Sequence, residues 1–103
     1  MIEQESHSTD EGVLEGEVVI VNELGLHTRT ATILVQSARK FASSIEVSME
    51  GASADGKSLL ELLTLGAGRG KVLRLRVAGP DRDEAFQTLA RLIERGFQEE
   101  EVQ

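Results

Sequence analysis

His27 and Arg29 are the two residues of this sequence whose types and spacing suggest chemistry. They lie in the stretch GLHTRTA (25–31), just ahead of an apolar repeat that predicts a helix. A neutral imidazole is a nucleophile, and a guanidinium offers charge and directional donors to an oxyanion. A helix start also presents about four N–H groups without an intrahelical acceptor, and their partial positive charge favours phosphate. The pattern suggests a histidine that accepts a phosphoryl group, held by Arg29 and by the N–H groups of Thr30 and Ala31.

The same spacing has a structural alternative. A single histidine near a helix start is more often a capping or surface residue than a nucleophile, and His-x-Arg alone is a weak motif. The second histidine, His7, lies in an acidic segment without companion ligands, and we expect it to be solvated and without a chemical role. The interpretation of His27 therefore depends on the rest of the chain.

The hydrophobic periodicity changes several times along the chain, and each change marks a predicted element. Period-two or β-branched runs predict four strands, at 16–23, 44–50, near 52–55 and at 71–79. Spacings of three and four predict three helices, with apolar stripes from Ala31 to Phe41, over 58–66 and from Ala85 to Phe97. Asp81 with Glu84 and Ser58 with Glu61 have the spacing of a capping box at the last two helix starts.

The element order is β-α-β-β-α-β-α. In the last strand Leu73, Leu75 and Val77 alternate with Arg74 and Arg76, so one face should be buried and the other should meet solvent. We therefore predict an α+β fold, a two-layer open-faced sandwich in which a four-stranded antiparallel sheet carries three helices on one face.

Composition excludes several classes of function. The 103 residues suit one domain, and a net charge of −7 from 11 basic and 18 acidic residues argues against nucleic acid as a partner. The chain has no Cys, which excludes disulfides and thiolate metal sites, and we expect neither a metal nor a cofactor. No apolar run approaches the roughly 20 residues that span a bilayer, and the acidic start does not resemble a secretory signal. We expect a cytoplasmic protein with a disordered acidic tail (1–14), one domain (15–98) and a frayed end (99–103).

Two motifs together resemble the HPr family, the histidine-containing phosphocarrier proteins of the bacterial phosphotransferase system. The first is Gly25-Leu26-His27-Thr28-Arg29 followed by Ala31, and the second is Lys57-Ser58-Leu59 followed by Thr64-Leu65-Gly66. The similarity runs from about Gly16 to Phe97 in the same element order. Two motifs at matching separation are far more specific than either one alone. The Gly66–Gly70 loop, in contrast, has no preceding strand or Walker lysine, and we interpret it as a helix stop rather than a nucleotide site.

The resemblance implies a phosphoryl carrier. Enzyme I, charged by phosphoenolpyruvate, would pass a phosphoryl group to Nδ1 of His27, which would pass it to an enzyme IIA-type protein. The resemblance also implies regulation of Ser58 by an HPr kinase/phosphorylase, and it implies a monomer. It assigns partner docking to Thr28, Leu59, Leu60 and Leu63. Since five leucines of one short helix cannot all point inward, we expect Leu59 or Leu60, with Leu63, to be exposed.

One residue departs from the family motif, because Thr30 stands where the family has proline. Proline in a first helical turn pre-sets φ, so its loss should cost about 0.4–1 kcal/mol through the entropy of the unfolded chain. The change also adds one amide donor at the predicted phosphate site.

Other functions remain open at this stage. The main alternative is an HPr-like regulatory binding module that responds at Ser58 without phosphoryl turnover at His27. An unrelated small α+β ligand-binding domain would not explain both motifs. An autonomous enzyme is disfavoured, because no second base or carboxylate pair accompanies His27.

Overall fold

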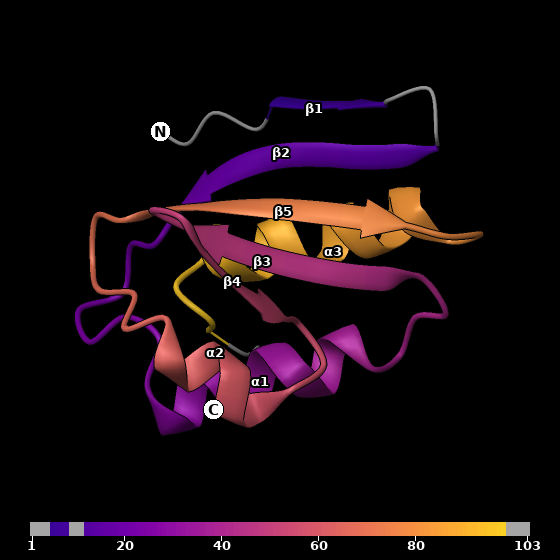
Figure 1. The fold of residues 1–103 in the computed structure, drawn as a ribbon. Coiled ribbons are helices and arrows are strands. Elements are labelled where there is room, and N and C mark those ends of the chain that lie inside the picture. The colour runs from indigo at the N-terminus through magenta and orange to yellow at the C-terminus, as the bar shows by residue number, and fades with distance from the viewer. Residues whose placement is uncertain (1–4, 9–11, 99–103) are drawn as a thin grey trace.

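The computed structural model of the protein describes residues 5–8 and 12–98. Its five strands are β1 (Glu5–Ser8), β2 (Val13–Val19), β3 (Ser44–Met49), β4 (Ala52–Asp55) and β5 (Val72–Ala78). Its three helices are α1 (Thr28–Ala38), α2 (Leu59–Thr64) and α3 (Arg82–Glu94). The strands form one sheet in the order β1-β2-β5-β3-β4, with every neighbouring pair antiparallel (Figure 1).

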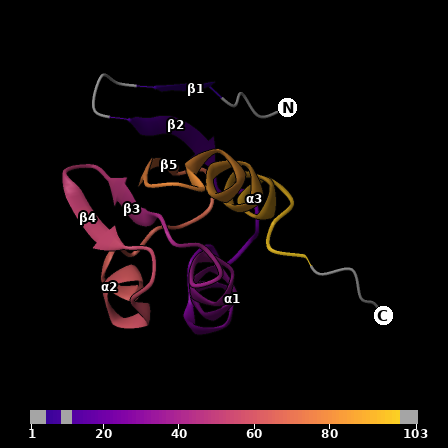
Figure 2. The ribbon, with the colours of Figure 1, turned by 90° about the vertical axis from the view of Figure 1, so that its right-hand side faces the viewer.

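The predicted two-layer α+β fold is confirmed, because β2 to β5 and the three helices follow the predicted order β-α-β-β-α-β-α, with β1 added ahead of them. Figure 2 shows α1 and α3 on the same face of the sheet, with α2 beside α1 and below β4. The core lies between these layers, because each long strand turns every second side chain toward the helices. In β5, Leu73, Leu75 and Val77 are fully buried, whereas Arg74 and Arg76 are exposed. Within the described residues, no helix has the length and apolar character needed to cross a bilayer.

Strand β1 is an addition to the predicted sheet. We expected disorder over 1–14, but Glu5–Ser8 pairs with β2, with His7 opposite Glu15, and β2 begins at Val13. A sheet ladder uses main-chain groups, so a polar segment can join an open edge without the apolar alternation that marks a half-buried strand. Hydrophobic periodicity therefore could not reveal β1. The rest of the predicted tails, at residues 1–4, 9–11 and 99–103, lies outside the described residues.

Asp81 begins α3 as its N-cap residue, but its carboxylate makes no capping bond, so the predicted capping box with Glu84 is wrong. Instead, Oδ1 of Asp81 accepts from the Ser43 hydroxyl at 2.6 Å and the Ser43 N–H at 2.9 Å, and Oδ2 accepts from the Ala42 N–H at 2.9 Å. These donors, the Ser43 hydroxyl first among them, lower the pKa of Asp81 from its usual value. The carboxylate thus ties the start of α3 to the segment that enters β3.

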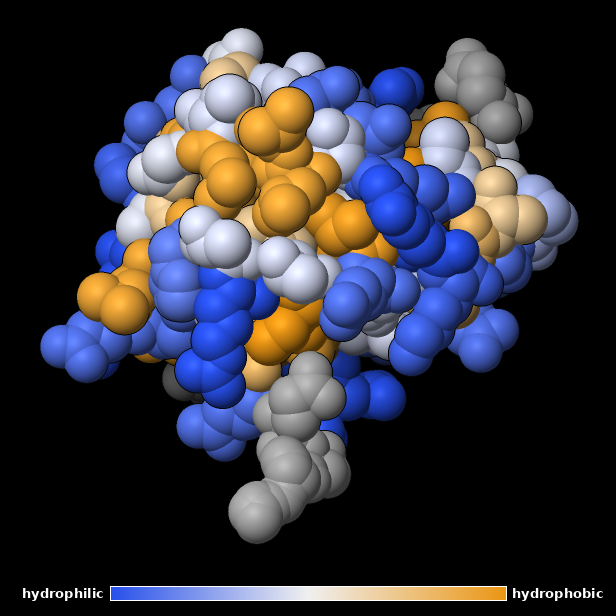
Figure 3. Space-filling model, turned by 90° about the horizontal axis from the view of Figure 1, so that it is seen from below, coloured by the Kyte–Doolittle hydropathy of each residue, from blue (hydrophilic) through white to orange (hydrophobic). Residues whose placement is uncertain are grey.

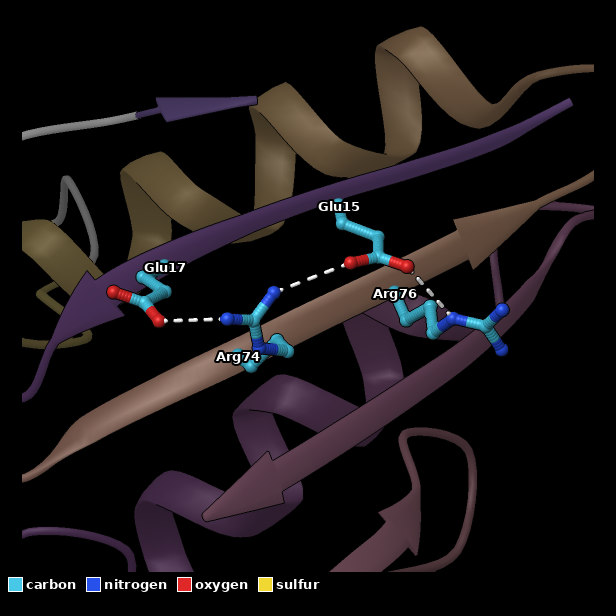
Figure 4. A network of polar contacts seen from close by, with 4 residues as sticks. All are labelled: Glu15, Glu17, Arg74 and Arg76. Carbon is cyan, nitrogen blue, oxygen red and sulfur yellow. Dashed lines mark hydrogen bonds and ion pairs between the residues drawn. The ribbon is translucent and has the colours of Figure 1, made fainter. Parts of the chain in front are cut away.

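The sheet face away from the helices carries a row of paired charges (Figure 4). Arg74 bridges two glutamates of the neighbouring strand, with Nη1 3.2 Å from a Glu15 oxygen and Nη2 3.0 Å from a Glu17 oxygen. Nε of Arg76 lies 2.9 Å from the other Glu15 oxygen. Both arginines therefore point outward as predicted, and both are paired with carboxylates there.

Candidate functional site

His27 is the N-cap of α1, as the apolar stripe predicted. Its backbone is extended (φ −126°, ψ −173°), and its side chain turns back so that Nδ1 accepts from the Arg29 N–H at 3.4 Å. That bond is long and therefore weak. The acceptor geometry assigns the Nδ1 lone pair to the side of the helix start and the ring proton to Nε2. The half-buried imidazole thus presents a nucleophilic nitrogen to the electropositive end of α1.

The backbone N–H groups of Arg29, Thr30 and Ala31 differ in their hydrogen-bond acceptors. The Ala31 N–H already donates to the His27 carbonyl at 2.8 Å, in the first hydrogen bond of the helix. The Arg29 N–H donates to Nδ1, and the Thr30 N–H faces the His27 side chain in a capping box at the start of α1. A phosphoryl group on Nδ1 would therefore find Arg29 and Thr30 the more available amides. Thr28 and the Arg29 side chain are exposed at the same helix end.

Thr30, which stands at the family's proline position, is buried and makes side-chain hydrogen bonds to the preceding loop. Its hydroxyl donates to the Gly25 carbonyl at 2.7 Å and accepts from the His27 N–H at 3.0 Å. The Asn22 side-chain amide donates to the same Gly25 carbonyl at 2.8 Å. The loop that carries His27 is therefore held by side chains on both sides of it.

Gly25 brings the two sequence motifs together. It has φ +68°, and a Cβ at this position would lie 2.4 Å from the Ala67 carbonyl oxygen and 2.7 Å from the Gly68 Cα. The next residue, Leu26, donates its N–H to the same Ala67 carbonyl at 2.8 Å. The loop that follows α2 thus lies directly against the loop that precedes His27, and only glycine permits this approach.

Ser58 is the N-cap of α2, and half of its predicted capping box is present. The Ser58 hydroxyl accepts from the Glu61 N–H at 3.3 Å. The Glu61 carboxylate, however, does not return to the Ser58 N–H. It accepts instead from the Asp55 N–H at 2.8 Å, while the Ser58 N–H donates to the Asp55 carbonyl at 3.0 Å. The Glu61 carboxylate therefore binds a residue of β4 instead of completing the capping box.

Lys57 and Arg39 link the start of α2 to the end of α1. The Lys57 ammonium donates to the Phe41 carbonyl at 2.8 Å, and the Arg39 guanidinium donates to the Lys57 carbonyl at 3.0 and 3.2 Å. Ser58 follows directly in sequence, so these bonds fix the position of the α2 cap relative to the helix that begins at His27.

The leucines of α2 divide as helix geometry requires. Leu62 is fully buried, Leu59 and Leu63 are half-buried, and Leu60 is 77% exposed. Figure 3 views the molecule from the side on which α1 and α2 lie, and it shows a contiguous apolar area bordered by hydrophilic residues. The prediction of an exposed leucine is confirmed for Leu60, whereas Leu63, which we also expected to be exposed, is half-buried.

Three features near His27 were missed by sequence reasoning. Leu24, in the loop before His27, is 72% exposed and adds a second large apolar side chain near this end of the molecule. Asn22 and the Thr30 hydroxyl both support the Gly25 carbonyl. An asparagine just after a strand is a recognisable turn residue, so Asn22 could have been found. Nothing in the sequence alone indicates where the Thr30 hydroxyl points.

Comparison with known proteins places this geometry in a family. The family model described as "PTS HPr component phosphorylation site" matches residues 14–95. The "Phosphocarrier protein HPr" of Xylella fastidiosa (strain 9a5c) is 39% identical over 88 residues, which cover 85% of this chain and 99% of that protein.

Solved structures agree with the sequence comparisons. The crystal structure of HPr-C-His from Thermoanaerobacter tengcongensis aligns with a TM-score of 0.79 at 39% identity, covering 84% of this chain and 98% of that one. A structure described as an HPr dimer from the same organism aligns with a TM-score of 0.67 at 39% identity, covering 80% and 94%. The chain belongs to the HPr family of phosphocarrier proteins of the phosphotransferase system.

Proposed function

We propose that the protein carries a phosphoryl group on Nδ1 of His27, received from enzyme I and delivered to enzyme IIA-type proteins. The observation that carries this proposal is the direction of Nδ1, which accepts from the Arg29 N–H at the start of α1. A phosphoryl group bonded there would form within the partial positive charge of the helix end. The exposed Arg29 guanidinium would supply a full charge to the same oxygens.

The transfer requires no cofactor at this site. The Nδ1 lone pair attacks phosphorus, the P–Nδ1 bond forms, and the bond between phosphorus and the donor atom breaks with its electron pair leaving on the donor. The ring is an imidazolium until Nε2 releases its proton to water. Delivery to the next protein reverses these changes, with the acceptor as nucleophile and His27 as the leaving group. The half-buried ring leaves phosphorus open to that second nucleophile.

Partners would dock on the apolar surface beside His27. We assign to this surface Thr28 at the start of α1 and Leu59, Leu60 and Leu63 of α2. An exposed apolar area bordered by polar residues is typical of a protein interface. We further propose that the protein works as a cytoplasmic monomer, since the phosphohistidine must meet two different partners in turn.

Ser58 is proposed as a regulatory phosphorylation site for an HPr kinase/phosphorylase. Its half-buried hydroxyl caps α2 within the same surface, so a phosphate there would sit at a helix start and change the charge that partners meet. The nearby Glu61 and Asp55 carboxylates would repel it, and Arg39 and Lys57 would attract it. This serine also carries the second candidate function, a regulatory binding module without turnover at His27.

One experiment separates the two functions. The protein is incubated with phosphoenolpyruvate and enzyme I, and the product is examined by intact mass and phosphorus NMR for an acid-labile adduct. We expect one adduct on the wild type and on Ser58→Ala, and none on His27→Ala. Arg29→Ala should be labelled about 10²-fold more slowly, by analogy with removal of one oxyanion donor. No labelling by an enzyme I that labels another HPr would reject the carrier and leave the binding module.

A further inference from the structure

The Thr30 hydroxyl closes a small ring of hydrogen bonds around the backbone that precedes His27. It donates to the Gly25 carbonyl at 2.7 Å and accepts from the His27 N–H at 3.0 Å, so both of its strong contacts lie within this loop. Between these two points, Leu26 is buried and its N–H is held by the Ala67 carbonyl. Every residue from Gly25 to His27 therefore has a main-chain group fixed by a partner.

This arrangement decides which face of the imidazole meets the helix. The extended backbone of His27 directs its side chain back over the first turn, where Nδ1 accepts from the Arg29 N–H. An Nδ1 that accepts a hydrogen bond is unprotonated, so the neutral ring carries its proton on Nε2. The 3.4 Å bond to Arg29 is too long to impose this orientation alone. The shorter bonds of the Thr30 hydroxyl act on the backbone from which the ring extends.

We propose that the Thr30 hydroxyl is a positioning group for phosphoryl transfer, holding the His27 backbone so that Nδ1 faces the helix start in its nucleophilic tautomer. This inference rests on the proposed function of His27. The Thr30 N–H is a separate contribution, since it faces the His27 side chain at the helix start and would also bind the phosphoryl group.

Substitutions at Thr30 separate the two contributions. Thr30→Val removes the hydroxyl and keeps the shape and the N–H, Thr30→Ser keeps both groups, and Thr30→Pro removes both. The matched control is Thr32→Val in the same helix. The Thr32 hydroxyl donates to the Thr28 carbonyl at 2.7 Å and makes no bond to the loop before His27. If Thr30→Val does not fold, Thr30→Ala takes its place.

The first measurement uses the unphosphorylated protein at a pH where His27 is neutral. The nitrogen-15 NMR shifts of the ring report which nitrogen carries the proton. We expect an unprotonated Nδ1 in the wild type, in Thr30→Ser and in Thr32→Val, and a mixture of tautomers in Thr30→Val. A folded Thr30→Val with the wild-type tautomer overturns the positioning role.

The second measurement is the rate of phosphoryl transfer from enzyme I. Loss of one well-placed hydrogen bond corresponds to about a tenfold effect, so Thr30→Val should be labelled about tenfold more slowly, with Thr30→Ser and Thr32→Val near the wild-type rate. Thr30→Pro should, in addition, shift the equilibrium with enzyme I toward the unphosphorylated form, because the Thr30 amide is gone. An unchanged rate in Thr30→Val also overturns the inference.

The two measurements keep the inference distinct from the function on which it rests. Absence of labelling on the wild type rejects the carrier function, whatever the tautomer of His27. A labelled wild type with unaffected Thr30→Val rejects only the positioning role.

Discussion

Gly25→Ala is the substitution that most directly tests how the His27 loop is built. Two separate costs apply to this residue. Alanine at φ +68° costs about 1–2 kcal/mol, because the left-handed conformation brings its Cβ against the carbonyl oxygen. The Cβ would also lie 2.4 Å from the Ala67 carbonyl oxygen and 2.7 Å from the Gly68 Cα. Both are backbone atoms, which cannot rotate away.

The steric cost is comparable to that of an overpacked core, in which an added methyl group costs about 1–3 kcal/mol. We therefore expect Gly25→Ala to lower the free energy of unfolding by about 2–5 kcal/mol. Gly66→Ala is the matched control, since Gly66 has φ +62° with nothing within 4 Å of its Cβ position. That variant should lose only the conformational term, about 1–2 kcal/mol.

Urea unfolding of both variants and the wild type measures the difference, which the structure places at about 1–3 kcal/mol. For a domain of this size, each kcal/mol also moves the thermal midpoint by about 4–8 °C. Equal losses in the two variants would show that the loop after α2 does not lie against Gly25, and the account of how the two motifs meet would be refuted. Labelling by enzyme I should slow in Gly25→Ala and not in Gly66→Ala.

Three further predictions concern stability. The folded pKa of Asp81 is lowered, so its contribution is present at pH 7 and is lost as pH falls below the unfolded value of about 3.9 and through the folded value. Asp81→Asn should therefore unfold at a lower urea concentration than the wild type at pH 7, and the difference between the two urea midpoints should shrink toward pH 2. A difference that stays constant with pH contradicts this prediction. Ser58→Ala should cost about 1 kcal/mol, while Ser58→Asp, which can still cap α2, should cost less in the same assay. Glu15→Gln should cost more than Glu17→Gln, because the Glu15 side chain is 19% exposed against 54%, and both losses should stay below about 1 kcal/mol and shrink in high salt. The reverse order would show that burial does not set the strength of these pairs.

The sequence predicts this fold well where periodicity governs it. The stripe from Ala31 onward placed His27 at a helix start, and the alternation of Leu73, Leu75 and Val77 identified the buried face of β5. Both patterns work because burial repeats with the geometry of the element itself. The exposed leucine of α2 was likewise predictable, since the four leucines of this six-residue helix cannot all lie on its buried face.

The errors arise where a side chain that could complete a local motif bonds instead to a residue outside that motif. Asp81 has the spacing of a capping residue, but its carboxylate accepts from the Ser43 hydroxyl, 38 positions earlier in the chain. Glu61 likewise turns to the Asp55 N–H. A capping box describes only what four adjacent residues can do for one another. The Thr30 hydroxyl differs, because its partners, the His27 N–H and the Gly25 carbonyl, are only three and five positions away, and its position depends on how this loop folds back on the helix.

Strand β1 has a consequence for association between molecules. Without it, the seven-residue β2 would be the rim of the sheet, and a long rim with free main-chain groups invites pairing with another chain. With β1 in place, both rims of the sheet, β1 and β4, are four residues long. Short rims offer few groups for a foreign strand to match. We therefore expect β1 to disfavour edge-to-edge aggregation between molecules.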